Sequence, residues 1–178
     1  MKQDKIRNNY VVREKVEDKL DRRGKMKIIK EIEKMVNEYL EEENEDFDDM
    51  FSGEVSENNI KEVEKILNVK FPVSYKWFLR KYGSGGIEGI DIQGIEEDKE
   101  SMKDTSVVYL TQQYRARWKI NPQWVVIEDI GEEIIVLDTN VHEDECPVIS
   151  WSQHDGEIII KNNNFAEYLL EKIKYMLE

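Results

Sequence analysis

The sequence predicts an α+β fold, in which helices pack on a mainly antiparallel, twisted sheet of about five to six strands. Two patterns lead to this fold class. Apolar residues recur at three- and four-residue spacing near the C-terminus and in several stretches of the first two thirds, which is typical of amphipathic helices. Between residues 124 and 160, short runs rich in Val and Ile alternate with polar turns, as in an antiparallel meander. A chain of 178 residues is long enough for one compact domain.

The first predicted helix covers residues 26–42, where Ile28, Ile32 and Met35 lie on one apolar stripe. The next stretch, 41–49, holds seven Asp or Glu and no Lys or Arg. Because like charges repel, we predict a solvated linker there. A calcium loop is the alternative, but the spacing and the glycine of an EF-hand are missing.

Two further helices are predicted after this linker. Ser56 precedes the first of them and can accept hydrogen bonds from the free amides of its first turn, and Asn68 offers a stop. Phe71 and Pro72 open the next helix, since Pro suits a first turn. The Gly-rich run 83–86 is predicted to end it. A phosphate-binding loop is disfavoured, because the run follows a helix and lacks the Gly-Lys-Ser/Thr ending.

The apolar period falls toward two after these glycines, so residues 87–95 are predicted to form a short hairpin that starts the sheet. A helix is expected near 106–118. Asn164 is predicted to cap a last helix. The intervening β-rich segments predict four strands, at residues 124–127, 134–137, 147–151 and 157–160.

Residues 1–25 are predicted to be a basic extension to a single domain formed by residues 26–178. They offer no sustained apolar face, so we expect them to be dispensable for folding. Residues 22–25 also fit purine-rich codons that resemble a bacterial ribosome-binding site in front of Met26. Two interpretations stay open: Met26 is the native start, or the basic tail is translated.

The formal net charge of −13 is unevenly distributed: residues 1–34 hold twelve Lys or Arg against seven Asp or Glu, so the rest carries −18. This sign argues against a nucleic-acid partner, because phosphates are contacted by Lys and Arg, and favours a basic protein. No apolar run approaches the roughly 20 residues that span a bilayer, so no membrane partner is expected. The single Cys146 and the absence of a secretory signal predict a cytoplasmic protein.

No catalytic, metal or cofactor site is predicted. His142, His154 and Cys146 do not match metal-binding spacings, and nothing places a base beside Cys146. Aromatic and cationic residues mix between Tyr109 and Trp118, but a nucleic-acid stripe needs a basic surface, so we expect a helix that partly covers the core. The chain is therefore not expected to be an enzyme.

Acidic residues gather at the predicted strand ends, where turns can bring distant carboxylates together into one negative rim. Such a rim would steer a basic partner, and ordinary solvation is the alternative. Asp138 has a second interpretation, as a turn residue that bonds its own backbone. The candidate partner-binding residues are Glu128, Asp129, Glu132, Glu133, Asp138, Glu143, Asp144 and Glu145.

Residues 56–86 carry a more specific pattern: an acidic helix, then Phe71-Pro72-Val73-Ser74-Tyr75, Phe78-Leu79 and a Gly-rich turn. This pattern resembles the opening signature of the SUKH superfamily. Gly94, the strand with an acidic exit at 125–129 and the segment 145–151 follow in the expected order, so the resemblance covers roughly residues 26–178. It is SUKH-1-like and closest to bacterial immunity proteins paired with LXG-type toxins.

The resemblance implies an α+β fold whose sheet and neighbouring loops bind a partner, with no catalytic residue and no cofactor. The implied function is that of an antitoxin, which neutralises a cognate secreted toxin by occluding it, and many LXG-type toxins are nucleases. Fungal relatives act as regulatory interaction scaffolds. A regulatory scaffold without a toxin partner is therefore the alternative function.

Overall fold

The computed structural model describes residues 22–140 and 144–178. The helical elements of this part are α2 (Arg22–Glu43), α3 (Phe47–Met50), α4 (Glu57–Leu67), α5 (Val73–Tyr82), the 3₁₀ helix η1 (Met102–Asp104), α6 (Ser106–Trp118) and α7 (Phe165–Leu177). The strands are β1 (Trp124–Asp129), β2 (Glu133–Asp138), β3 (Val148–Ser152) and β4 (Ile158–Asn162). The fold is α+β, as predicted.

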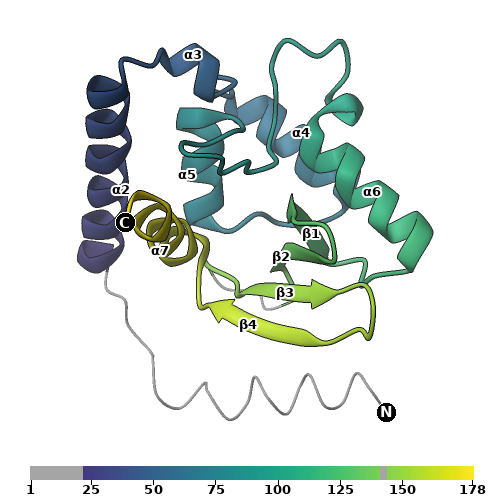
Figure 1. The fold of residues 1–178 in the computed structure, drawn as a ribbon. Helices are drawn as coiled ribbons and strands as arrows, with labels where there is room; N and C mark the ends of the chain where they lie inside the picture. Colours follow the sequence, from purple (N-terminus) through teal and green to yellow (C-terminus); the bar gives the residue numbers. More distant parts are fainter. Residues whose placement is uncertain (1–21, 141–143) are drawn as a thin grey trace.

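The sheet is an antiparallel meander in which the strands follow in chain order, β1-β2-β3-β4 (Figure 1). The described residues form four strands, so the prediction of five to six was wrong. The two strands that do not form are those of the hairpin expected at residues 87–95. The β-contact of this segment is an isolated bridge between Ile92 and Gly85. All four isoleucines between 87 and 95 are buried, and their spacing of three, two and three residues suits a loop packed into the core, not a two-faced strand.

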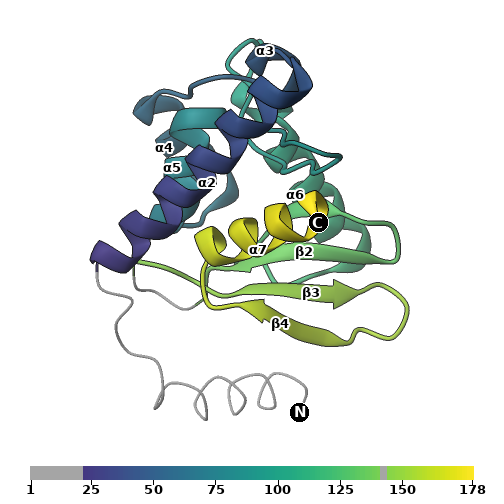
Figure 2. The same cartoon turned by 60° about the vertical axis from the view of Figure 1, so that its left-hand side comes forward.

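Helices cover both faces of the sheet (Figure 2). Val125, Ile127 and Leu137 point into the main core, which also holds residues of α2, α4, α5 and α7. Val126 and Val136 point to the opposite face and form a second core with Tyr114 of α6. This alternation follows from the two-residue period of a strand.

Helix α2 begins at Arg22, four residues before the predicted start, and it covers the main core with Ile32 and Val36. The predicted linker at 41–49 contains the last turn of α2 and the short helix α3, so that prediction was wrong in part. Phe47 explains the difference, because its ring packs on Phe51 and anchors the turn. Residues 1–21 lie outside the described part, and the predicted dispensability of residues 1–25 stays a prediction.

The predicted helix boundaries between α4 and α5 are confirmed. The Ser56 hydroxyl accepts a hydrogen bond from the Asn59 amide at 3.2 Å, and Asn68 ends α4 in the left-handed conformation. Pro72 stands at the N-cap of α5, directly before its first turn. Asn164 caps α7 by accepting from the Glu167 amide at 2.9 Å.

Helix α5 supplies the aromatic centre of the main core. Tyr75 is fully buried and Phe78 is 1% exposed. Both rings contact Phe165 of α7, with centroids 5.1 and 5.5 Å away. Both residues are therefore core positions, whereas Trp151 of β3 is only half-buried, at the border of the second core.

Replacing Phe78 by Ala should lower the free energy of unfolding by about 3–5 kcal/mol, because the change leaves a cavity between α5 and α7. Urea unfolding followed by circular dichroism measures this loss. Val73→Ala on the same helix is the control, since Val73 is 49% exposed and its truncation should change stability by less than about 0.5 kcal/mol. Equal stability of the two variants would contradict the assignment of α5 as the aromatic centre.

Candidate functional site

The carboxylates predicted to form one rim lie at two opposite ends of the sheet. Residues 128–133 belong to the β1–β2 turn and the strand ends beside it, whereas Asp138 is the last residue of β2, and Asp144 and Glu145 precede β3 at that same end of the sheet. The six residues of β2 separate the two groups by roughly 16 Å at a rise of about 3.3 Å per residue. The strand-end residues therefore do not come together as a single surface.

Glu128 lies inside the protein, where it fastens α7 to the sheet. It is 3% exposed, accepts a hydrogen bond from the Tyr168 hydroxyl at 2.6 Å and forms an ion pair with Lys172. Burial of Tyr168, together with the negative charge of Glu128, raises the pKa of this tyrosine well above its usual range. Glu128 thus has a structural role, whereas its position at the end of a strand predicted a partner-binding one.

Three more rim residues accept hydrogen bonds from neighbouring groups. Asp129 accepts from the Tyr114 hydroxyl at 2.7 Å, and Glu133 accepts from Ser150 Oγ at 2.9 Å. Asp138 is 2% exposed and accepts from the backbone amide of Asn140 two residues on, which matches its second interpretation as a turn residue.

Glu145 caps helix α5 from a distant part of the chain. Pro72 has no side chain that can accept, and Glu145 instead accepts from the Ser74 amide at 3.2 Å and from Ser74 Oγ at 2.6 Å. Lys25 of α2 lies 3.5 Å from the same carboxylate. Glu143 lies outside the described residues. Within the described part, Asp129, Glu132 and Asp144 remain exposed members of the predicted rim.

A larger acidic surface lies on the side of the molecule away from β4 (Figure 1), and it reaches β1 through the Gln93 amide, which donates to the Ile127 carbonyl at 2.8 Å. We call it the acidic end and define it as residues 41–57 and 86–104. The first segment holds nine Asp or Glu and no Lys or Arg, and the second holds seven against two Lys, so the acidic end carries a net charge of −14. Apart from Glu96, which is half-buried, all of these carboxylates are exposed.

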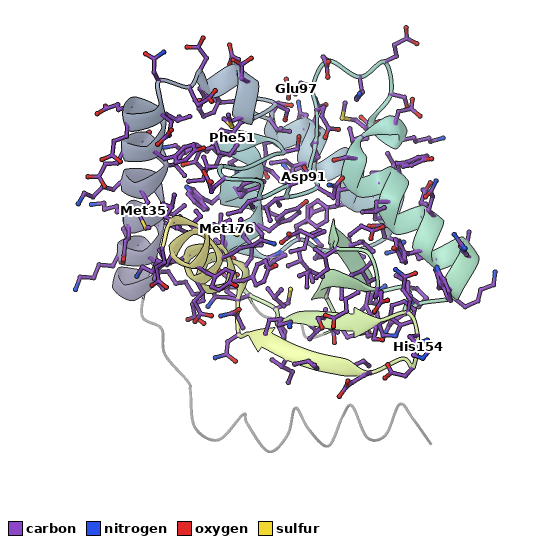
Figure 3. The ribbon with its side chains drawn as sticks, in the orientation of Figure 1. Met35, Phe51, Asp91, Glu97, His154 and Met176 are labelled. Atoms are coloured by element: carbon purple, nitrogen blue, oxygen red, sulfur yellow. The ribbon has the colours of Figure 1, made fainter. Side chains whose placement is uncertain are left out.

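Hydrogen bonds join the two segments of the acidic end. The Gly86 amide donates to the Met50 carbonyl at 3.1 Å, and Ser52 Oγ donates to the Ile95 carbonyl at 3.2 Å. Gly83 has a φ of +72°, and a Cβ atom there would overlap Ser52 and Gly53. The Gly-rich turn that ends α5 therefore permits this approach. Figure 3 shows Phe51 of the first segment and Asp91 and Glu97 of the second in the same half of the molecule.

Few of the acidic-end carboxylates have structural partners. Glu97 accepts from the Ser56 amide at 2.5 Å, and this hydrogen bond lowers the pKa of Glu97. Glu57 pairs with Arg80, whose hydrogen bond lowers the pKa of Glu57. A hydrogen bond to Glu88 raises the pKa of Tyr39, and the charges of nearby carboxylates add to the effect. Tyr39 of α2 therefore contacts the second acidic segment through Glu88.

Only the first segment of the acidic end stands out in the sequence. The acidic run at 41–49 is evident there, but by itself it predicts a linker and not a surface. Its partner segment begins about forty residues later, and only the tight packing around Gly83 brings the two together. The Gly-rich run 83–86, which lies between the two acidic segments in the sequence, is the feature that indicates a close backbone approach.

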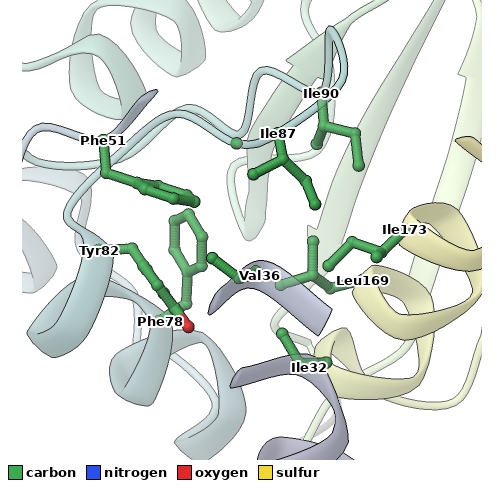
Figure 4. A pocket seen from close by; sticks show the side chains of 10 residues that line it. Ile32, Val36, Phe51, Phe78, Tyr82, Ile87, Ile90, Leu169 and Ile173 are labelled. Carbon is green, nitrogen blue, oxygen red and sulfur yellow. The ribbon is translucent and has the colours of Figure 1, made fainter. Parts of the chain in front are cut away.

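The remaining candidate groups have structural roles. Burial raises the pKa of the Cys146 thiol well above its usual range, which keeps the thiol protonated. A cavity of about 10 Å³ lies between α2, α5 and α7 (Figure 4), which is room for no more than about one water molecule. Tyr82, whose buried hydroxyl has no hydrogen-bond partner among the described residues, lines it. Within residues 22–140 and 144–178, no cluster of three His, Cys, Asp or Glu has a geometry that fits a metal ion.

The predicted aromatic and cationic stripe lies on α6. Tyr114 of this helix is buried against the sheet, as expected for a helix that partly covers the core. Tyr109 and Trp118 are exposed, and Arg117 stacks on Trp118 with 5.3 Å between the guanidinium carbon and the ring centroid. Across the part of the chain that the structure describes, no helix is both long enough and apolar enough to cross a membrane.

Comparison with protein families gives a match over residues 32–174 to the SUKH_5 model, which is described as SMI1-KNR4 cell-wall. The match covers well over half of the chain. The chain belongs to the SUKH superfamily. The resemblance seen at residues 56–86 is thereby confirmed, and the matched range of this SUKH protein contains the sheet and both segments of the acidic end.

Replacing Glu128 by Gln keeps the size of the side chain but removes the charge that pairs with Lys172. We expect the free energy of unfolding to fall by about 1–3 kcal/mol, because a partly buried ammonium loses its partner. Chemical unfolding at neutral pH measures the change. Glu132→Gln is the matched control, since Glu132 is exposed and the change there should stay within about 0.5 kcal/mol. Wild-type stability of the Glu128 variant would argue against its structural role.

Proposed function

We propose that this SUKH protein is an immunity protein, an antitoxin that binds a cognate secreted bacterial toxin in the cytoplasm and blocks it by occlusion. The observation that carries the proposal is the acidic end, where two segments place a net charge of −14 on one side of the molecule. Membership in the SUKH superfamily supports a binding role. A basic protein domain is the partner that this charge favours.

A nuclease domain of the LXG class fits these requirements best. A nuclease must bind a polyanion, so its active-site surface carries Lys and Arg. A strongly acidic protein surface competes for that same basic surface, and charge complementarity also raises the rate of encounter. The toxin is then blocked because its substrate cannot reach the occupied surface.

This mechanism requires binding and no chemistry by the immunity protein. The Cys146 thiol is buried and held protonated, which makes it a poor nucleophile. Glu57 and Glu97 serve to hold the acidic end together through Arg80 and Ser56. The other exposed carboxylates are therefore the groups available for a basic partner.

Reversing charges at the acidic end should slow toxin binding. The test variant replaces Asp48 and Asp98 by Lys, one residue from each acidic segment, both exposed and with no side-chain hydrogen bond among the described residues. The matched control replaces Glu132 and Asp144 by Lys, which are equally exposed and equally without side-chain hydrogen bonds in the described part, and which change the net charge equally at the predicted rim. Association with the toxin domain encoded by the neighbouring gene is measured at low and high salt. We expect the acidic-end variant to associate roughly tenfold more slowly at low salt, and less so at high salt.

The control decides between the surfaces. Slower association of the rim variant alone would assign binding to the strand ends. Unchanged association of both variants, with full protection of cells that express the toxin, would leave an apolar contact as the better account. A chain that protects against no neighbouring toxin and copurifies with endogenous proteins would favour the regulatory scaffold.

A further inference from the structure

The two edges of the sheet differ in how their backbone groups are satisfied. On the outer side of β1, the Val126 amide donates to Thr111 Oγ1 at 3.0 Å. The Trp124 carbonyl on the same side accepts from the Arg115 guanidinium at 3.2 Å. Helix α6 therefore closes this edge, and no further strand can pair with β1 there.

The β4 edge is open within the described part of the chain. The Ser152 amide donates to the Glu157 carbonyl at 3.0 Å, which sets the alternation of the antiparallel pair. Ile159 consequently faces its partner Ser150 on β3, and the backbone groups of Ile158 and Ile160 point outward. Among residues 22–140 and 144–178, no backbone hydrogen bond reaches this outer side.

The edge is also apolar on both faces. Ile159 is 43% exposed on one face. Ile158 and Ile160 are half-buried on the other, at the border of the second core beside Trp151. An exposed edge with three consecutive isoleucines is a site where another strand pairs readily.

The sequence of this edge complements itself. Residues 157–161 read Glu-Ile-Ile-Ile-Lys. When two copies pair in antiparallel fashion about a two-fold axis at Ile159, each Glu157 lies opposite Lys161 of the second copy. The outward backbone groups of Ile158 then meet those of Ile160 of the second copy, as a hydrogen-bonded pair requires.

Other registers lose these contacts. A shift by one residue moves the two charges off each other and rotates every side chain to the wrong face. A parallel in-register pair would place Lys161 beside Lys161 and Glu157 beside Glu157. A β-bulge at Lys161 in the β3–β4 pairing ends the regular backbone edge at Ile160, so Glu157 and Lys161 meet across the axis through their side chains alone. Since α6 closes the β1 edge, strand addition stops at two copies.

We propose that a second copy of this chain docks on β4, so that two four-stranded sheets join into one across a two-fold axis. The occupant is a second copy, because the charge pattern of residues 157–161 fits its own antiparallel image. The acidic end lies on the opposite side of the molecule from β4 (Figure 1, Figure 2). Both acidic ends stay free in such a dimer, and the inference does not depend on the proposed function.

Sedimentation of the full chain over a range of concentrations tests this arrangement. We expect a species of twice the 21.2 kDa chain mass. Glu157→Lys alone or Lys161→Glu alone places like charges opposite each other twice, which should raise the dimer dissociation constant roughly tenfold. The double variant E157K/K161E restores both pairs and should restore the dimer. Glu62→Lys and Lys61→Glu, exposed on α4, are the matched controls.

Amide hydrogen exchange gives the second readout, because strand pairing protects the outward amides of Ile158 and Ile160 as concentration rises. A chain that stays monomeric at every concentration would overturn the proposal. So would a dimer that the single charge reversals leave unchanged, or one that the double variant fails to restore. Protection of the β4 amides that appears only with a toxin domain would assign this edge to a different partner and equally overturn it.

Discussion

The rest of the structure depends on the packing of helix α5. Its aromatic residues contact α7 through Phe165 and the α3 region through Phe51. The Tyr75 hydroxyl, inside the core, donates to the Gln93 carbonyl at 2.6 Å and so fixes the loop that follows the Gly-rich turn. Helix α5 thus contacts α7 on one side and the segments around Phe51 and Gln93 on the other. Its position therefore determines where the two acidic segments lie.

Carboxylates serve two different purposes around this centre. Glu64 accepts from the Phe71 amide at 2.7 Å and pairs with Lys76, while Glu145 caps the first turn of α5. These groups, like Glu128, are largely buried and paired, so they stabilise the fold and are poorly placed to meet a partner. The exposed carboxylates accumulate where loops leave the aromatic centre, and the proposed binding of a basic partner uses that surface.

The sequence was sufficient for features that depend on neighbours along the chain. Periodicity located the five longer helices and the strands β1 to β4, and Ser56, Asn68 and Asn164 act as the predicted caps. It missed α3, however, and predicted a hairpin at 87–95 that the described residues do not form. The sequence was insufficient where contacts join distant segments. The roles of Glu128 and Glu145 depend on Lys172 and Ser74, more than forty residues away in each case. The acidic end was missed for the same reason, since its halves meet only through the packing of the loop after α5.

The proposed function places the partner on the acidic end. Hydrogen exchange of the chain, alone and mixed with the toxin domain that the proposal assigns to it, maps the contact surface without any substitution. We expect slower exchange in residues 41–57 and 86–104 on binding, with little change in the β1–β2 turn. Slower exchange confined to the strand ends or to the sheet face, with both acidic segments unchanged, would contradict it.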